Sequence, residues 1–142
     1  MTHSKGTLIS SLVISFLLGV GSTLAAHRLY STVLKPSGFY THALSNSGFD
    51  FKLLHMHSSN KTHVYWVYEN RPTLFQSESG LMAKTLYSKV TVDCSNFQTT
   101  ILEQRAFDHE GLFLARNKTI VKNTSGSIAA NLAMIEACIT RL

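Results

Sequence analysis

The stretch that decides the fold is Leu86–Cys94, with the sequence LYSKVTVDC. From Val90 onward every second residue is apolar or a cysteine, namely Val90, Val92 and Cys94, and the residues between them are polar. This period of two is typical of a β-strand that turns one face toward a core. The strand therefore brings a cysteine to the buried side of a predicted sheet.

The last segment of the chain predicts a helix that docks on this sheet. Ser127 can cap a helix from Ile128 to about Arg141, a segment rich in Ala and Leu. One apolar stripe runs along it at helical spacing, formed by Ile128, Leu132, Ile135 and Ile139. We expect this stripe to pack on the sheet, with Cys138 beside it in the interface.

Further outward, the chain predicts four more short strands with alternating apolar and polar side chains. They cover Phe49–His57, Thr62–Glu69, Thr99–Phe107 and Leu112–Arg116. Turn-forming residues separate them, so we expect an antiparallel meander. We expect Asn70-Arg71-Pro72 to end the second of these strands, and the stretch from there to Gly80 to be a loop.

The N-terminal residues 1–26 have the order of regions found in a secretory signal. Met1–Gly6 carries one Lys and no acid, Leu8–Val20 is apolar, and the following residues are small, with Thr23 and Ala25 at the −3 and −1 positions. We favour a cleaved signal peptide. An uncleaved transmembrane helix is the alternative, because the length of the segment from Leu8 to Ala26 is close to the ~20 apolar residues that a membrane-spanning helix needs.

The predicted fold class is therefore α+β. A hydrophobic N-terminal helix comes first, residues 27–48 are a linker or edge segment, and residues 49–142 form an antiparallel sheet meander with the C-terminal helix on one face. With either interpretation of the N-terminus, we expect the domain to be exported to the periplasm or cell envelope, with inner-membrane anchoring if the segment stays uncleaved.

The chain contains only two cysteines, Cys94 and Cys138. In an exported protein an even number of cysteines favours a disulfide bond. Closing the loop between them would stabilise the fold by about 4 kcal/mol in the chain-entropy model. Two buried free thiols, or a redox pair, are the alternatives, although a redox pair would require the Cys-x-x-Cys spacing that is absent here.

The charge balance is mildly basic, with 13 Lys and Arg against 8 Asp and Glu and a net charge of +5. The basic residues are scattered, so the sequence gives no footprint for nucleic acid. Arg116, Lys118 and Lys122 share parity along one extended segment and can form a basic edge. We interpret them as candidate partner contacts, together with Trp66 and Tyr68, whose outward-facing member could lie in an interface.

Metal binding and catalysis find little support in the sequence. His55 and His57 are two residues apart on a predicted strand, a spacing that can chelate Zn²⁺ or offer a haem ligand. A four-residue turn over Ser58–Lys61 would place His63 on the opposite face, so these two histidines stay weak metal candidates. Motifs for a nucleophile, a phosphate loop or paired carboxylates are absent. We expect no cofactor and no enzymatic activity.

Several stretches together resemble the surface-adhesin protein E-like family. They are Trp66-Val67-Tyr68-x-Asn70, Tyr87-Ser88-Lys89 leading into Val92-Asp93-Cys94, the Phe107-Asp108…Gly111 turn, and a Ser-initiated C-terminal helix that ends in Cys138. The resemblance covers about Thr62 to Ile139. It implies a small exported bacterial protein with an antiparallel sheet, a disulfide-tethered helix and an adhesin role. The lipidation cysteine of the founding members is missing.

The sequence thus predicts a non-enzymatic bacterial envelope protein that binds another macromolecule, such as a host matrix protein, through its sheet surface. The first alternative is a single-pass accessory subunit of a membrane complex, with its domain in the periplasm. The second alternative is a small metal- or haem-binding periplasmic carrier. An exposed sheet edge would also permit a homodimer.

Overall fold

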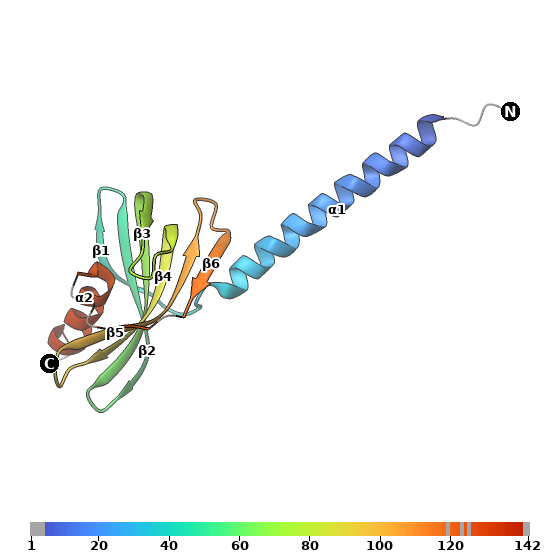
Figure 1. The fold of residues 1–142 in the computed structure, drawn as a ribbon. Helices are drawn as coiled ribbons and strands as arrows, with labels where there is room; N and C mark the ends of the chain where they lie inside the picture. Colours follow the sequence, from blue (N-terminus) through green and yellow to red (C-terminus); the bar gives the residue numbers. More distant parts are fainter. Residues whose placement is uncertain (1–4, 119, 123, 125, 141–142) are drawn as a thin grey trace.

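Alternating side chains in the middle of the chain produce a sheet, and the Ala-rich C-terminal segment produces a helix on one of its faces (Figure 1). The computed structural model describes residues 5–118, 120–122, 124 and 126–140, with side chains from residue 19 onward except at position 42. The elements are α1 (Lys5–Leu34), β1 (Thr41–Asn46), β2 (Phe49–Ser59), β3 (Thr62–Gln76), β4 (Met82–Asp93), β5 (Gln98–Phe107), β6 (Phe113–Asn117), β7 (Val121–Lys122), α2 (Ile128–Ile135) and a π-helical turn, η1 (Glu136–Thr140).

The strands form one antiparallel meander, as predicted. In the described part of the chain, seven strands make a single sheet in the order β1-β2-β3-β4-β5-β6, and β7 pairs with β5 beyond the end of β6. Tight connections hold neighbours in register, and Asn60 in the β2–β3 turn has a φ of 50°, a conformation that Asn tolerates better than most residues. The predicted α+β class with an antiparallel sheet is therefore confirmed.

The predicted end of the second strand at Pro72 is wrong. β3 continues to Gln76, and its pairing with β4 lapses after Asn70 and resumes at Phe75. Proline cannot donate a ladder hydrogen bond, but Pro72 lies in this unpaired stretch, where no donor is needed. In place of the expected loop there is only a short turn between β3 and β4, in which the Ser77 N–H donates a hydrogen bond of 2.8 Å to the carbonyl of Leu81.

One face of the sheet is covered by α2. The helix begins at the predicted cap, where the Ser127 hydroxyl accepts a hydrogen bond from the Ala130 N–H at 3.3 Å. Its buried residues are Ala129, Ala130 and Ala133. Together with Ala137 of η1 they pack on apolar side chains of the sheet: Leu53, Tyr65, Val67, Val90, Val92 and Ile101. We call this side of the sheet the helix face.

Most of the predicted apolar stripe of this helix does not face the sheet; Leu132 alone of its four residues is half-buried, near Leu53 of β2. Ile128, Ile135 and Ile139 are 43%, 46% and 60% exposed, whereas Ala130 and Ala133 are fully buried. Small side chains allow the helix backbone to approach the sheet closely, and isoleucines at the same positions would hold it further away. The helix was expected to end near Arg141, which lies outside the described residues.

The disulfide between Cys94 and Cys138 is confirmed, with the two Cα atoms 5.5 Å apart and 44 residues apart in sequence. Cys94 follows β4 directly, and Cys138 lies in the η1 turn, where its neighbour Ala137 is also buried. The close approach of the alanine side of the helix is what brings the two sulfur atoms within bonding reach.

The N-terminal helix α1 projects from the side of the sheet, and its last turns contact β6 and β5 (Figure 1). The ring of Tyr30 lies against Phe113 with 5.8 Å between centroids, and the buried Ser31 hydroxyl accepts from the Phe113 N–H at 2.8 Å. Arg105 donates to the carbonyl of Leu34 at 2.5 Å. Among the residues that the structure describes, no helix has both the length and the apolar character to cross a membrane.

The segment 27–48, expected to be a linker or edge segment, contains the last turns of α1 and the edge strand β1. A stretch without helix or strand remains from Lys35 to Tyr40. We call it the crossing segment, because it links α1 on one side of the sheet to β1 on the other.

The buried alanines of α2 generate a stability prediction. Ala133→Leu should overpack the helix–sheet interface and lower the free energy of unfolding by about 1–3 kcal/mol. Ile135→Ala, at a half-exposed position of the same helix, should change it by less than ~1 kcal/mol. Urea denaturation of the oxidised proteins measures both values. If Ile135→Ala costs more than Ala133→Leu, the isoleucine stripe faces the sheet and our assignment is wrong.

Candidate binding site

The sheet face opposite α2 is built largely from aromatic side chains. Successive residues of a strand point to opposite faces, so the residues between those that meet the helix form a second cluster. Its members are Leu54, Trp66, Tyr87 and Phe107, with Tyr40, Tyr68 and Phe113 packed against them. Edge-to-face contacts of 5.3 Å join Tyr87 to both Tyr68 and Phe107. We call this side the aromatic face.

The crossing segment lies over this face. Gly38 sits so close to the sheet that a Cβ atom there would be 2.6 Å from Leu54 Cδ1, and its φ of 152° also favours glycine. The ring of Tyr40 contacts Tyr87 at 6.5 Å, and its hydroxyl donates to the carbonyl of Pro36 at 3.0 Å. The segment therefore covers part of the aromatic face.

Basic side chains lie on the rings of the aromatic face. Lys35 lies 5.5 Å from the centroid of Phe107, Lys52 lies 5.1 Å from Tyr68, and Arg105 lies 4.7 Å from Trp66. Cation–π pairs of this kind occur about once per 70–80 residues in proteins, so three on one face of a small domain is an enrichment. The face thus combines aromatic rings with basic side chains, of which Lys52 is also paired with Asp50 at 3.0 Å.

The arginines at the β5–β6 edge of this face are held by one carboxylate. Glu103 accepts from Arg105 Nε and from Arg116 Nε, each at 2.6 Å. Burial acts to raise the pKa of Glu103, but the hydrogen bonds from Arg116 and Arg105 outweigh it, and the pKa is lowered. The pair of arginines is therefore fixed in place beside an ionised acid.

A pocket of about 360 Å³ opens on the aromatic face. Tyr68, Tyr87 and Phe107 form its aromatic side, Asn70 and Thr85 lie at one end, and Lys35 faces the β5–β6 turn of residues 108–111. This volume falls within the range of ~300–1,000 Å³ that small-ligand pockets occupy. The pocket combines rings, hydroxyls, one amide and charges of both signs.

Internal hydrogen bonds hold several polar groups of the pocket. Asp108 Oδ1 accepts from the N–H groups of Glu110 and Leu112, at 2.9 and 2.8 Å. The Thr85 hydroxyl donates to Asn70 Oδ1 at 3.1 Å, so the amide nitrogen of Asn70 remains as a donor. The site is therefore largely preformed.

Burial also sets the state of the tyrosine hydroxyls. It raises the pKa of Tyr87 to about 12, with a further contribution from the neighbouring Tyr68. Burial and the nearby Asp50 raise the pKa of Tyr68 as well, and Lys52 opposes them. Both hydroxyls consequently stay protonated at neutral pH and can donate hydrogen bonds.

The predicted partner contacts are distributed unevenly over this face. Trp66 is 5% exposed and lies beneath Arg105, so it belongs to the core and its predicted contact role is corrected. Tyr68 is half-buried and lines the pocket. Arg116 is exposed but paired with Glu103. Lys122 is exposed on β7 opposite Thr100, and Lys118 is exposed between β6 and β7.

The histidine pair expected on one face is separated. A register shift between His55 and His57 places His55 opposite Tyr65 and His57 opposite Val64. Consecutive cross-strand pairs alternate between faces, so the two imidazoles point to opposite sides. His55 instead meets His63, with 6.1 Å between the rings. Among the described residues, no group of three His, Cys, Asp or Glu side chains could hold a metal ion.

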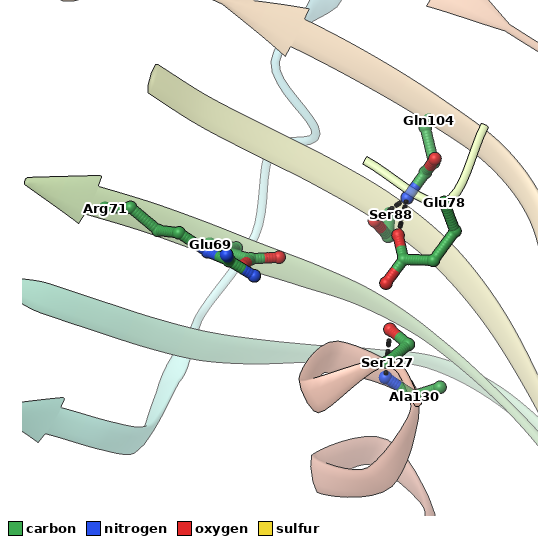
Figure 2. A network of polar contacts seen from close by, with 7 residues as sticks. All are labelled: Glu69, Arg71, Glu78, Ser88, Gln104, Ser127 and Ala130. Atoms are coloured by element: carbon green, nitrogen blue, oxygen red, sulfur yellow. Dashed lines mark hydrogen bonds and ion pairs between the residues drawn. The ribbon is translucent and has the colours of Figure 1, made fainter. Parts of the chain in front are cut away.

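A buried polar network on the helix face was not predicted (Figure 2). Gln104 is 1% exposed, and its amide nitrogen donates to Glu78 Oε2 and Ser88 Oγ, both at 2.9 Å. Its Oε1 accepts from the Ser79 N–H at 3.1 Å. These bonds fasten the β3–β4 turn onto the sheet, which is a structural role.

Glu69 lies on the same helix face and is 2% exposed. Burial raises its pKa, and the Arg71 guanidinium, whose Nε donates to Oε1 at 2.5 Å, offsets part of this effect. The sequence contained a signal for this position: the alternation of Tyr65 and Val67 places the next inward residue at Glu69. An inward acid on a strand indicates a buried partner.

Comparison with protein families, curated proteins and solved structures finds no match to this chain. The resemblance to the surface-adhesin protein E-like family therefore stays a prediction. What can be said of the site depends on its geometry: preformed donors and acceptors beside aromatic rings, suited to binding.

The buried phenol of Tyr87 predicts a loss of stability in alkali. Its pKa is about 12 in the folded protein and about 10 in an unfolded chain. Between these pH values the unfolded state releases the proton and the folded state keeps it, so the free energy of unfolding falls as the pH rises. Tyr87→Phe should reduce this fall by on the order of 2 kcal/mol. Urea titrations at pH 10 and pH 12 measure it.

The control is Tyr30→Phe, because Tyr30 is 56% exposed on α1. This variant should show the same alkaline loss of stability as the parent protein. An equal loss in the Tyr87→Phe variant would show that this phenol is not buried as described.

Proposed function

We propose that this chain is an exported, non-enzymatic protein of the bacterial cell envelope that binds another macromolecule through the aromatic face of its sheet. The observation that carries the proposal is the gathering of lysines and arginines on the rings of this face around an open pocket. Aromatic and Arg side chains are enriched in the cores of protein interfaces. The opposite face is taken up by α2, so a partner meets the aromatic face.

Two further features support this proposal. The disulfide is compatible with an oxidising compartment outside the cytoplasm. The fold has the disulfide-tethered helix that the adhesin-like resemblance implies, and adhesins of that kind contact host matrix proteins. The partner we propose is such a matrix protein, and the basic residues of the aromatic face would meet an acidic region of it.

A second candidate is an accessory subunit that keeps its N-terminal helix and docks on a membrane complex. The observation that favours it is the continuity of α1, which runs unbroken through the predicted cleavage site after Ala25 and then packs on the sheet through Tyr30 and Ser31. Mass spectrometry of the mature protein separates the two candidates. A start near Ala26 or His27 supports the released protein, whereas an intact Met1 supports the subunit.

Charge reversal tests the proposed binding face. Lys52→Glu and Lys122→Glu each alter a side chain on the aromatic face, whereas Lys61→Glu makes the same change in the β2–β3 turn. Exposed ionic contacts contribute about 0.2–1 kcal/mol each, and reversal also adds repulsion. We expect recovery of the partner to fall about threefold or more with either face variant.

Recovery is measured by quantitative mass spectrometry after co-purification from native membranes in mild detergent, with a matrix-protein extract added for the adhesin role. Lys61→Glu should recover the partner as well as the parent protein does. If Lys61→Glu weakens recovery as strongly as the two face variants, the aromatic face is not the binding surface.

A further inference from the structure

The pocket on the aromatic face is lined by charged groups of both signs, Lys35 on one side and Asp108 with the more exposed Glu110 on the other. Lys35 contributes a cation, held between the Phe107 ring and Gly111. Asp108 contributes an anion, and the backbone N–H groups of its own turn partly compensate its charge. A strongly anionic ligand would meet the carboxylates of Asp108 and Glu110, and a strongly cationic ligand would meet Lys35. A neutral ligand whose own groups both donate and accept hydrogen bonds can satisfy groups of both signs together.

The polar groups of the pocket exclude an apolar ligand. Tyr68 and Tyr87 bring hydroxyl donors, Asn70 brings amide N–H groups, and Asp108 brings carboxylate oxygen. An apolar molecule would remove these groups from water without replacing their hydrogen bonds, which costs free energy at each group. The ligand must itself carry several donors and acceptors.

The aromatic side of the pocket adds a third requirement. Tyr87 and Phe107 are 8% and 0% exposed, so the half-buried Tyr68 ring is the aromatic surface that adjoins the polar groups of the pocket. A ligand that fits must therefore combine an apolar C–H face with hydroxyls at its rim. A sugar ring has this construction, since its hydroxyls both donate and accept and its C–H groups can stack on an aromatic ring.

We propose that this pocket binds a neutral saccharide unit, and that the macromolecular partner of the proposed function is recognised through its glycan. Tyr68 stacks on the sugar ring and donates its hydroxyl, Asn70 donates its amide, and Lys35 and Asp108 bind opposite sides of the ligand. The proposal rests on the proposed binding function and specifies the chemistry of its ligand.

Saturation-transfer NMR and calorimetry with the full chain test the proposal. The probes are three neutral tetrasaccharides, chitotetraose, cellotetraose and maltotetraose, and we expect at least one to bind with a Kd on the order of 1 mM or tighter. Tyr68→Phe removes one hydroxyl, and Asn70→Asp replaces the amide donors with an acid. Each should weaken binding about three- to tenfold.

Tyr40→Phe is the matched control, because the Tyr40 hydroxyl bonds to Pro36 and does not line the pocket. It should bind the saccharide as the parent protein does, and thermal melts confirm that all three variants are folded. The proposal is overturned if none of the tetrasaccharides binds, or if Tyr68→Phe and Asn70→Asp bind as tightly as the control.

Two charged probes, 3′-sialyllactose and glycylglycine, complete the design. Binding of either one in place of all neutral tetrasaccharides would show that the pocket selects an anionic or a zwitterionic ligand, and would overturn the saccharide proposal. None of these results would change the measured recovery of the partner or its dependence on Lys52 and Lys122. Failure of the saccharide site and failure of the binding face are therefore distinguishable.

Discussion

The bond between Cys94 and Cys138 is the constraint on which the arrangement of this domain depends. It joins the end of a central strand to the η1 turn that follows α2, so the C-terminal helix cannot leave the sheet as a separate segment. The helix presents alanines to the sheet and isoleucines to solvent, an arrangement whose small apolar contact would hold a short helix weakly without the covalent link. The bond compensates for the modest contact area.

Fixing the helix on one side determines what the other side can do. The helix face is closed by α2 and by the β3–β4 turn, which Gln104 fastens through hydrogen bonds to Glu78 and Ser79. The aromatic face carries instead the crossing segment, and a pocket remains between Lys35 of that segment, the strands of this face and the β5–β6 turn. The binding surface that we propose is therefore the face that α2 leaves uncovered.

Local patterns in the sequence predicted the meander, the Ser127 cap and the cysteine pair, because strand alternation and capping depend on neighbouring residues. These local patterns could not predict the contacts between residues that are far apart in the sequence. The isoleucine stripe looked like the buried side of the helix, but the small alanines face the sheet and allow the close approach that the bond between Cys94 and Cys138 needs. A register shift between His55 and His57 places the two histidines on opposite faces. No turn-forming residue in the sequence indicates this shift. The pocket escaped prediction because Lys35 approaches the face from a segment that looked like a linker.

The most direct test of this account is the free energy of unfolding, measured by urea denaturation with circular dichroism, for the oxidised protein and for the protein kept reduced with dithiothreitol. Reduction should lower this free energy by about 4 kcal/mol, because a loop of more than 40 residues is no longer closed in the unfolded state. Identical midpoints and slopes for the two samples would contradict it, since the helix would then be held on the sheet without help from sulfur.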